Sequence, residues 1–171
     1  LGYVIAGHCS DGVGETIYQP SVSASNAVGT VAADTHWPSQ SSYADAAWVP
    51  YSNVAAKIYG SGGVQQTVKG YYTDCGIGLP VYKSGITTGT TSGATIRKDI
   101  VFNGDTKKYL YDQYFVSYSA ANGDSGAPVY HVEPDHDRIV VGIHSGNFNG
   151  EEYFSPVSGV QAALGVLPLT G

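Results

Sequence analysis

Gly, Ser, Asn and Pro divide this sequence into short apolar or alternating runs, and this division decides the class of fold. Runs of this length are expected as β-strands rather than as helices. The expected strands cover residues 2–6, 28–32, 46–49, 65–72, 79–84, 93–101, 109–119, 127–132 and 138–145. A short helix is expected only near the C-terminus, within residues 156–164. Closely spaced strands with one late helix predict an all-β fold, either barrel or sandwich.

The composition supports a packed β protein and excludes several functions. Of 171 residues, 42% are hydrophobic and only 13% are charged, which argues against a disordered chain. The net charge of −6 disfavours nucleic acid and anionic membranes as partners. No apolar run approaches the roughly 20 residues of a membrane-spanning helix. We therefore expect a monomer without nucleic-acid or membrane partners.

The stretch Gly60–Gly63 interrupts the strand pattern and predicts a boundary between two halves, residues 1–65 and 66–171. A chain of this length suits one domain or two small barrels that share an interface. The sequence begins at Leu1 rather than Met, which we interpret as a processed or cropped start.

The two cysteines, Cys9 and Cys75, match no metal-binding spacing. They could pair only if their Cα atoms came within about 7 Å, which the sequence leaves open. The low charge and the abundance of Gly, Ser, Thr and Tyr favour a secreted protein.

The segment Asn122–Pro128 carries the strongest chemical signal. It reads Asn-Gly-Asp-Ser-Gly-Ala-Pro, so that Ser125 follows an aspartate and stands between glycines on an expected tight turn. Such a turn can direct the N–H groups of Gly123 and Ser125 at one point, where they would stabilise an oxyanion. The alternative is a β-turn with this sequence and no catalytic role.

A serine nucleophile needs a base, and the base needs a carboxylate to orient it. Among the five histidines, His8 is favoured because it directly follows an apolar strand, which holds a side chain rigidly. Asp45 precedes the apolar run 46–49 and is the preferred carboxylate, with Asp34 as its rival. Any of these residues could instead have a purely structural role.

In this order, the motifs Ala6–Cys9, Asp45–Val49 and Gly123–Pro128 resemble those of the chymotrypsin-like serine proteases. Residues 81–89 are similar to a Lys/Arg-Ser/Gly-x-Thr-Thr-Gly turn of the bacterial streptogrisin branch. The resemblance covers nearly the whole chain. It implies two six-stranded antiparallel β-barrels with a cleft between them, His8 and Asp45 in the first and Ser125 in the second. It also implies a protease without a cofactor that acts on protein or peptide substrates.

The chain departs from this family in three places. Only seven residues precede His8 where the family has about two more strands, so the first barrel is expected to be truncated. Ala127 replaces a glycine, and Cys9 has no upstream cysteine. Apart from these departures, no trypsin-type activation is expected, because Leu1–Tyr3 does not resemble the Ile-Val-Gly-Gly start whose amine would pair with Asp124.

The run 141–147 resembles the strand that lines the primary specificity pocket, with Ser145, Gly146 and Asn147 beside an extended substrate. Ser145 matches the serine that usually hydrogen-bonds the catalytic aspartate. Ser119 lies six residues before the nucleophile and argues against a preference for Lys or Arg before the scissile bond. Asn122 is also expected to contact the substrate. An imidazole at His144 can donate to a carboxylate or an amide. We expect cleavage after Glu, with Asp or Gln next; the alternative is a structural histidine with an apolar preference.

Three other readings remain open. The fold could belong to an inactive binding module, although such a module has no need for His8, Asp45 and Ser125 together. A β-sandwich adhesion or carbohydrate-binding module would leave the ordered motifs unexplained. The charged tip between residues 131 and 137 could hold Ca²⁺, but solvated charges are expected there, so we predict no metal site.

Overall fold

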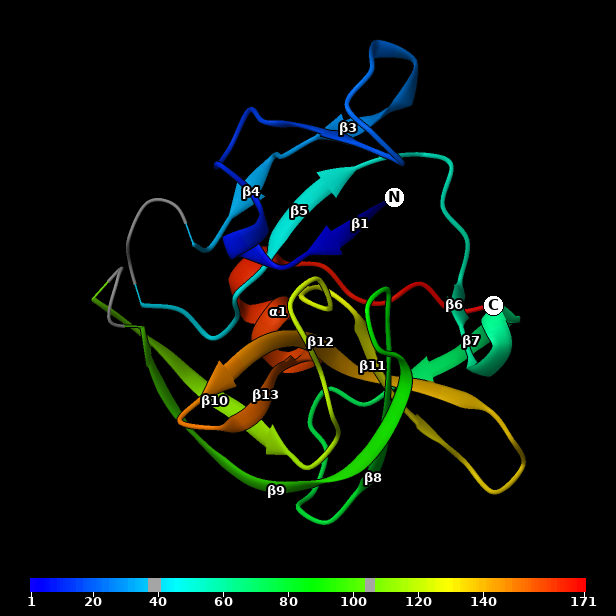
Figure 1. Ribbon diagram of the computed structural model, residues 1–171, viewed down its shortest axis with the longest axis vertical. Helices are drawn as coiled ribbons and strands as arrows, with labels where there is room; N and C mark the ends of the chain where they lie inside the picture. The colour runs from blue at the N-terminus through cyan, green and yellow to red at the C-terminus, as the bar shows by residue number, and fades with distance from the viewer. Residues whose placement is uncertain (37–40, 104–106) are drawn as a thin grey trace.

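The computed structural model of the chain describes residues 1–36, 41–103 and 107–171. A small N-terminal group of strands lies above a larger barrel in Figure 1, and helix α1 lies between them. The regular elements are β1 Gly2–Ile5, η1 Gly7–Cys9, β2 Thr16–Tyr18, η2 Ala24–Asn26, β3 Ala27–Thr30, β4 Ala33–Asp34, β5 Ala47–Pro50, β6 Lys57–Tyr59, η3 Ser61–Gly63, β7 Gln65–Tyr71, β8 Pro80–Gly85, β9 Gly89–Asn103, β10 Lys108–Val116, β11 Pro128–Val132, β12 Arg138–Phe148, β13 Glu151–Pro156 and α1 Val157–Leu164.

The C-terminal part forms a closed barrel. Neighbouring strands follow the order β11-β8-β9-β10-β13-β12, and antiparallel pairing of β11 with β12 closes the ring. Closure leaves these strands without free edges, which gives a rigid frame for the loops at its rim. Strand β7 pairs in parallel with the first residues of β12, Arg138–Val140, and β6 pairs with β7.

The N-terminal part is an open arrangement. Strands β1, β5 and β4 form one small sheet, and β2 and β3 form a separate ribbon. Val31, Ala47 and Val49 form their shared core. The all-β fold with a complete second barrel, an incomplete first barrel and one short C-terminal helix is therefore confirmed.

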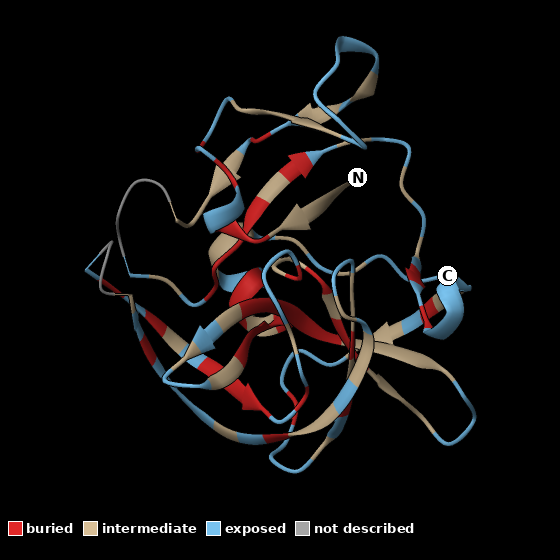
Figure 2. Ribbon diagram, in the orientation of Figure 1, coloured by how far each residue is buried: buried red, intermediate tan, exposed pale blue. Residues whose placement is uncertain are grey.

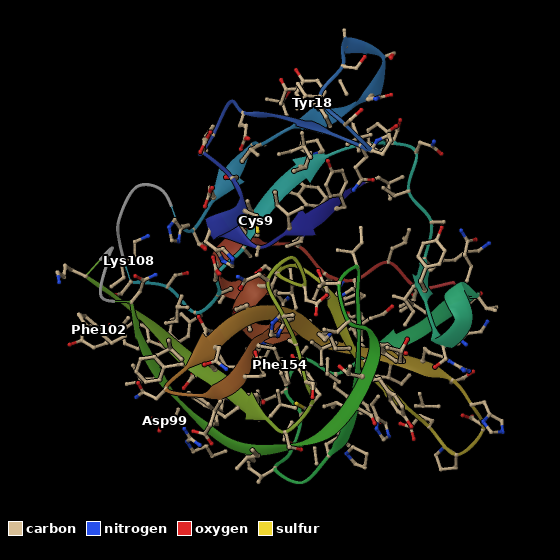
Figure 3. The ribbon with its side chains drawn as sticks, viewed as in Figure 1. Cys9, Tyr18, Asp99, Phe102, Lys108 and Phe154 are labelled. Atoms are coloured by element: carbon tan, nitrogen blue, oxygen red, sulfur yellow. The ribbon has the colours of Figure 1, made fainter. Side chains whose placement is uncertain are left out.

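The barrel interior is filled by alternate side chains of its strands, shown as buried segments in Figure 2. Val81, Val129, Val141 and Phe154 are fully buried there. Phe154 lies inside the barrel in Figure 3 and stacks on Tyr114 with ring centroids 5.4 Å apart. Burying each such side chain contributes about 1.5–3 kcal/mol.

Helix α1 binds the two parts together. Its Val160 packs with Ile143 of the barrel and with Ala44 and Ala46 of the N-terminal part. The helix ends where Gly165 adopts a left-handed conformation (φ 70°) and its N–H caps a helical carbonyl. This cluster fixes the segment around Asp45 against the barrel.

Strands β2, β4, β6 and β13 were not expected from the sequence. Strand β13 begins with two glutamates and ends in Ser-Pro, so its polar residues hide its strand character. The boundary at residue 65 stays a prediction, although pairing of β6 with β7 ties residues 57–59 to the larger sheet.

Both cysteines are free thiols: Cys9 is exposed on the N-terminal part (Figure 3) and Cys75 is buried. Within the described residues, no helix has the length and apolar character needed to cross a membrane.

Candidate active site

The loop between β10 and β11 forms the turn predicted around Ser125. Gly123 and Gly126 both have positive φ, 99° and 85°, a conformation that favours glycine. The N–H of Gly126 donates to the carbonyl of His144 at 2.8 Å, which ties the turn to β12. Ser125 is thereby held at the edge of the barrel that faces the N-terminal part.

His8, Asp45 and Ser125 meet although they are distant in sequence. The His8 Nε2 atom lies 2.9 Å from Ser125 Oγ, and its Nδ1 atom lies 2.5 Å from Asp45 Oδ2. The backbone N–H of His8 also donates to Asp45 Oδ1 at 2.9 Å. Two bonds to one carboxylate fix the position of the imidazole, with one ring nitrogen left for the serine hydroxyl.

Local structure explains this placement. His8 lies in the short 3₁₀ turn Gly7–Cys9 that follows β1, so its ring projects from a rigid strand end. A Cβ atom on Gly7 would lie 2.9 Å from Asp45 Oδ1, so a larger residue would press on the carboxylate. The hydrogen bond that His8 Nδ1–H donates to Asp45 raises the pKa of His8 above its ordinary value of 6.5, because the carboxylate stabilises the imidazolium.

Asp45 is only 5% exposed and is anchored from the barrel. Its N–H donates to Ser155 Oγ at 3.1 Å, and that hydroxyl donates to Gln113 Oε1 at 2.7 Å. Ser145, expected to bond the carboxylate, instead has its Oγ atom 3.0 Å from Ser155 Oγ. Within the described residues Ser145 makes no bond to the carboxylate of Asp45, and Ser155 is the residue that links it to the Asp45 backbone.

Asp34, the rival carboxylate, does not contact His8. Its side chain accepts hydrogen bonds from the Ser10 hydroxyl and from the N–H of His36. No role was predicted for His36 from the sequence, yet its Nδ1 atom lies 3.9 Å from Asp45 Oδ1. A second imidazole therefore borders the carboxylate, and its ring centroid lies 6.3 Å from that of His8.

Asp124 is buried beneath the turn with a fully buried lysine. Lys83 Nζ lies 3.1 Å from Asp124 Oδ2, and both side chains are 0% exposed. Burial alone would raise the pKa of Asp124, but bonds from the Thr88 hydroxyl, the Thr87 N–H and the lysine hold it well below its ordinary value. The Lys83 ammonium is thus the positively charged partner of Asp124.

The turn also leaves two donors available. In the part of the chain that the structure describes, the N–H groups of Gly123 and Ser125 donate no hydrogen bond. The hydroxyl of Thr87 donates to the carbonyl of Asn122 at 2.8 Å and holds this side of the turn. Two adjacent free N–H groups beside a serine hydroxyl are suited to bind an oxyanion.

The predicted specificity residues are divided between surface and interior. Ser119, Asn122 and Asn147 are exposed, and Gly146 is half-buried. His144 is only 3% exposed, with Tyr118 and Glu152 as its side-chain neighbours. Neither neighbour was singled out in the sequence. The tip at residues 131–137 and the other described residues contain no group of three acidic, histidine or cysteine side chains placed to hold a metal ion.

No protein-family model matches the chain. Solved structures do: a chymotrypsin of Cellulomonas bogoriensis has a TM-score of 0.78 at 24% identity, with 99% of this chain and 86% of that one covered. Thermobifida fusca protease A has a TM-score of 0.76 at 26% identity, covering 99% and 85%. A glutamic acid-specific serine protease, described as using a histidine triad in substrate binding, has a TM-score of 0.74 at 26% identity, covering 97% and 85%.

The fold is that of the chymotrypsin-like serine proteases. Among proteins of that fold, the chain is similar to the bacterial proteases represented by these structures. Peptides are accordingly the substrates that the class implies.

Proposed function

We propose that this protein is a secreted serine endopeptidase in which Ser125 is the nucleophile, His8 the general base and Asp45 the residue that orients His8. The observation that carries the proposal is the pair of contacts made by one imidazole, 2.9 Å to the Ser125 hydroxyl and 2.5 Å to the Asp45 carboxylate. A binding module would gain nothing from this arrangement around free N–H donors.

The reaction proceeds in two acyl-transfer steps. His8 Nε2 removes the proton of the Ser125 hydroxyl while Oγ bonds to the substrate carbonyl carbon. The N–H groups of Gly123 and Ser125 stabilise the resulting oxyanion, and loss of one such donor costs about 10²–10³ in rate. His8 then protonates the leaving amine, the C–N bond breaks, and water repeats the sequence to release the acid.

The substrate backbone would lie along Ser145–Asn147 as an added strand. The residue before the scissile bond would end in a carboxyl or carboxamide, Glu, Asp or Gln, which His144 binds. The likeness to a glutamic acid-specific protease and the imidazole at residue 144 support this preference. The low charged fraction of 13% supports secretion, which recovery of the active protein from the medium of its native host would test.

A fluorophosphonate probe tests the catalytic proposal. The folded protein should be labelled at Ser125, and Ser125→Ala should abolish labelling. Ser92→Ala provides a matched control, because Ser92 is exposed on β9 and should leave labelling unchanged. A folded wild-type protein that resists the probe would instead favour the inactive binding module.

A further inference from the structure

Tyr118 fixes which nitrogen of His144 carries a hydrogen. The Tyr118 hydroxyl lies 2.9 Å from His144 Nδ1 and has no other hydrogen-bond partner among the described residues. Burial raises the pKa of Tyr118 well above its ordinary value, so the phenol keeps its proton. A buried hydroxyl with one neighbour donates to it. His144 is therefore held as the tautomer with its hydrogen on Nε2.

The Nε2 atom of His144 faces a carboxylate. Glu152 Oε2 lies 3.8 Å from it, too far for a hydrogen bond, and Glu152 Oε1 accepts from Asn147 Nδ2 at 3.1 Å. Burial lowers the pKa of His144 to about 4, and the nearby Lys83 ammonium also lowers it. At neutral pH the imidazole is a neutral donor, and the Glu152 side chain offers an acceptor oxygen beside it.

We propose that Tyr118, His144 and Glu152 together select substrates with glutamine before the scissile bond. This inference rests on the proposed function and narrows its preference. Strand β12 pairs Asn147 with Glu152 on β13, which places the carboxylate directly beside the segment expected to bind the substrate backbone. Glu152 is partly exposed, with 17% of its side chain accessible, so an incoming side chain can reach it.

The spacing suits a primary amide. From its bond lengths, the oxygen and nitrogen of a carboxamide lie about 2.3 Å apart. With each atom about 2.9 Å from its partner, an amide fits across two groups separated by 3.8 Å. The amide oxygen then accepts from His144 Nε2–H and the amide NH₂ donates to Glu152 Oε2. Both groups of the site gain a bond that they lack in the free protein.

Other side chains satisfy only part of this pair. A glutamate side chain accepts from His144 but directs its second oxygen at the Glu152 carboxylate. A lysine side chain can pair with Glu152 but offers no acceptor to His144 Nε2–H. An apolar side chain desolvates His144 Nε2–H and Glu152 Oε2 and gives neither atom a hydrogen-bond partner, which sites of this kind penalise strongly.

The experiment compares peptides that differ only in the residue before the scissile bond, Gln, Glu, Lys or Leu, by kcat/KM at neutral pH. Gln should exceed Glu by about tenfold or more, since one unfavourable charge contact of about 1.4 kcal/mol gives that factor. Glu152→Gln should raise the rate with Glu and bring the Gln-to-Glu ratio down about tenfold. Tyr118→Phe should lower the rate with Gln more than the rate with Leu.

Glu151→Gln is the matched control. It removes the same charge one residue earlier on β13, where the side chain pairs with Arg97 instead, so the ratio should not change. A protein that labels at Ser125 but cleaves best after Glu or Lys would refute this inference and leave the protease assignment intact. A folded protein that neither labels nor cleaves would refute the proposed function and the inference together.

Discussion

Replacing the buried Lys83 by methionine tests how the turn at Ser125 is supported. The substitution keeps an unbranched side chain of nearly the same length and removes its charged end, which leaves Asp124 buried without the Lys83 ammonium. Breaking a buried ion pair from one side costs about 3–5 kcal/mol. Asp124 would keep its bonds from the Thr87 and Thr88 N–H groups, the Thr88 hydroxyl and the Ala121 N–H. We therefore expect the lower end of that range, about 3 kcal/mol.

Urea unfolding at neutral pH measures this cost. With a slope of about 1–3 kcal/mol per molar urea, the midpoint of Lys83→Met should fall by roughly 1–3 M. The control is Lys98→Met, the same substitution at the exposed pair with Asp74, where we expect about 0–1 kcal/mol. Adding Asp124→Asn to Lys83→Met should restore part of the loss, because the unpaired charge is removed.

The rate of fluorophosphonate labelling should fall with the stability of the turn, since Asp124 lies between Gly123 and Ser125. If Lys83→Met cost no more than Lys98→Met, and labelling were unaffected, the ion pair would not be what supports the nucleophile.

Four further predictions concern the rest of the site and the core. Because Asp45 raises the pKa of His8 above 6.5, kcat/KM should increase with pH through that raised pKa as His8 loses its proton. Asp45→Asn should move this increase to lower pH and reduce the maximum value of kcat/KM. The bond between His8 and Asp45 should contribute fully to the free energy of unfolding below about pH 6.5. This contribution should decline as pH rises through the pKa of His8 in the folded protein, as urea titrations would show. Gly7→Ala should slow probe labelling markedly without unfolding the protein, because its Cβ would press on Asp45 Oδ1. Phe154→Ala should cost about 3–5 kcal/mol of unfolding free energy, measured in urea, because it empties the centre of the barrel.

The sequence predicted what depends on local chemistry. A serine between glycines, a histidine after an apolar strand and an aspartate before one each carry their own signal, and the structure brings these three together. Most strands were found because apolar runs and turn residues mark them. Strand β13 was missed because its first residues, Glu151 and Glu152, are charged.

The partners of a buried group were harder to predict than the group itself. His144 was singled out, but Tyr118 reaches it from the loop after β10 and Glu152 reaches it from β13, so no single segment of the sequence encodes these contacts. The pairing of Lys83 with Asp124 is similarly non-local, because the turn after β8 has to fold against the loop that carries the serine.

The position of Asp45 depends on the barrel more than on the strands around it. Gln113 accepts a hydrogen bond from Ser155, which holds the Asp45 N–H, and Gln113 Nε2 donates to the Tyr43 carbonyl at 3.0 Å. The loop that carries the carboxylate is therefore held at two points by side chains of β10 and β13. Because the closed barrel holds this loop, His8 and Asp45 can meet Ser125 even though the first barrel is incomplete.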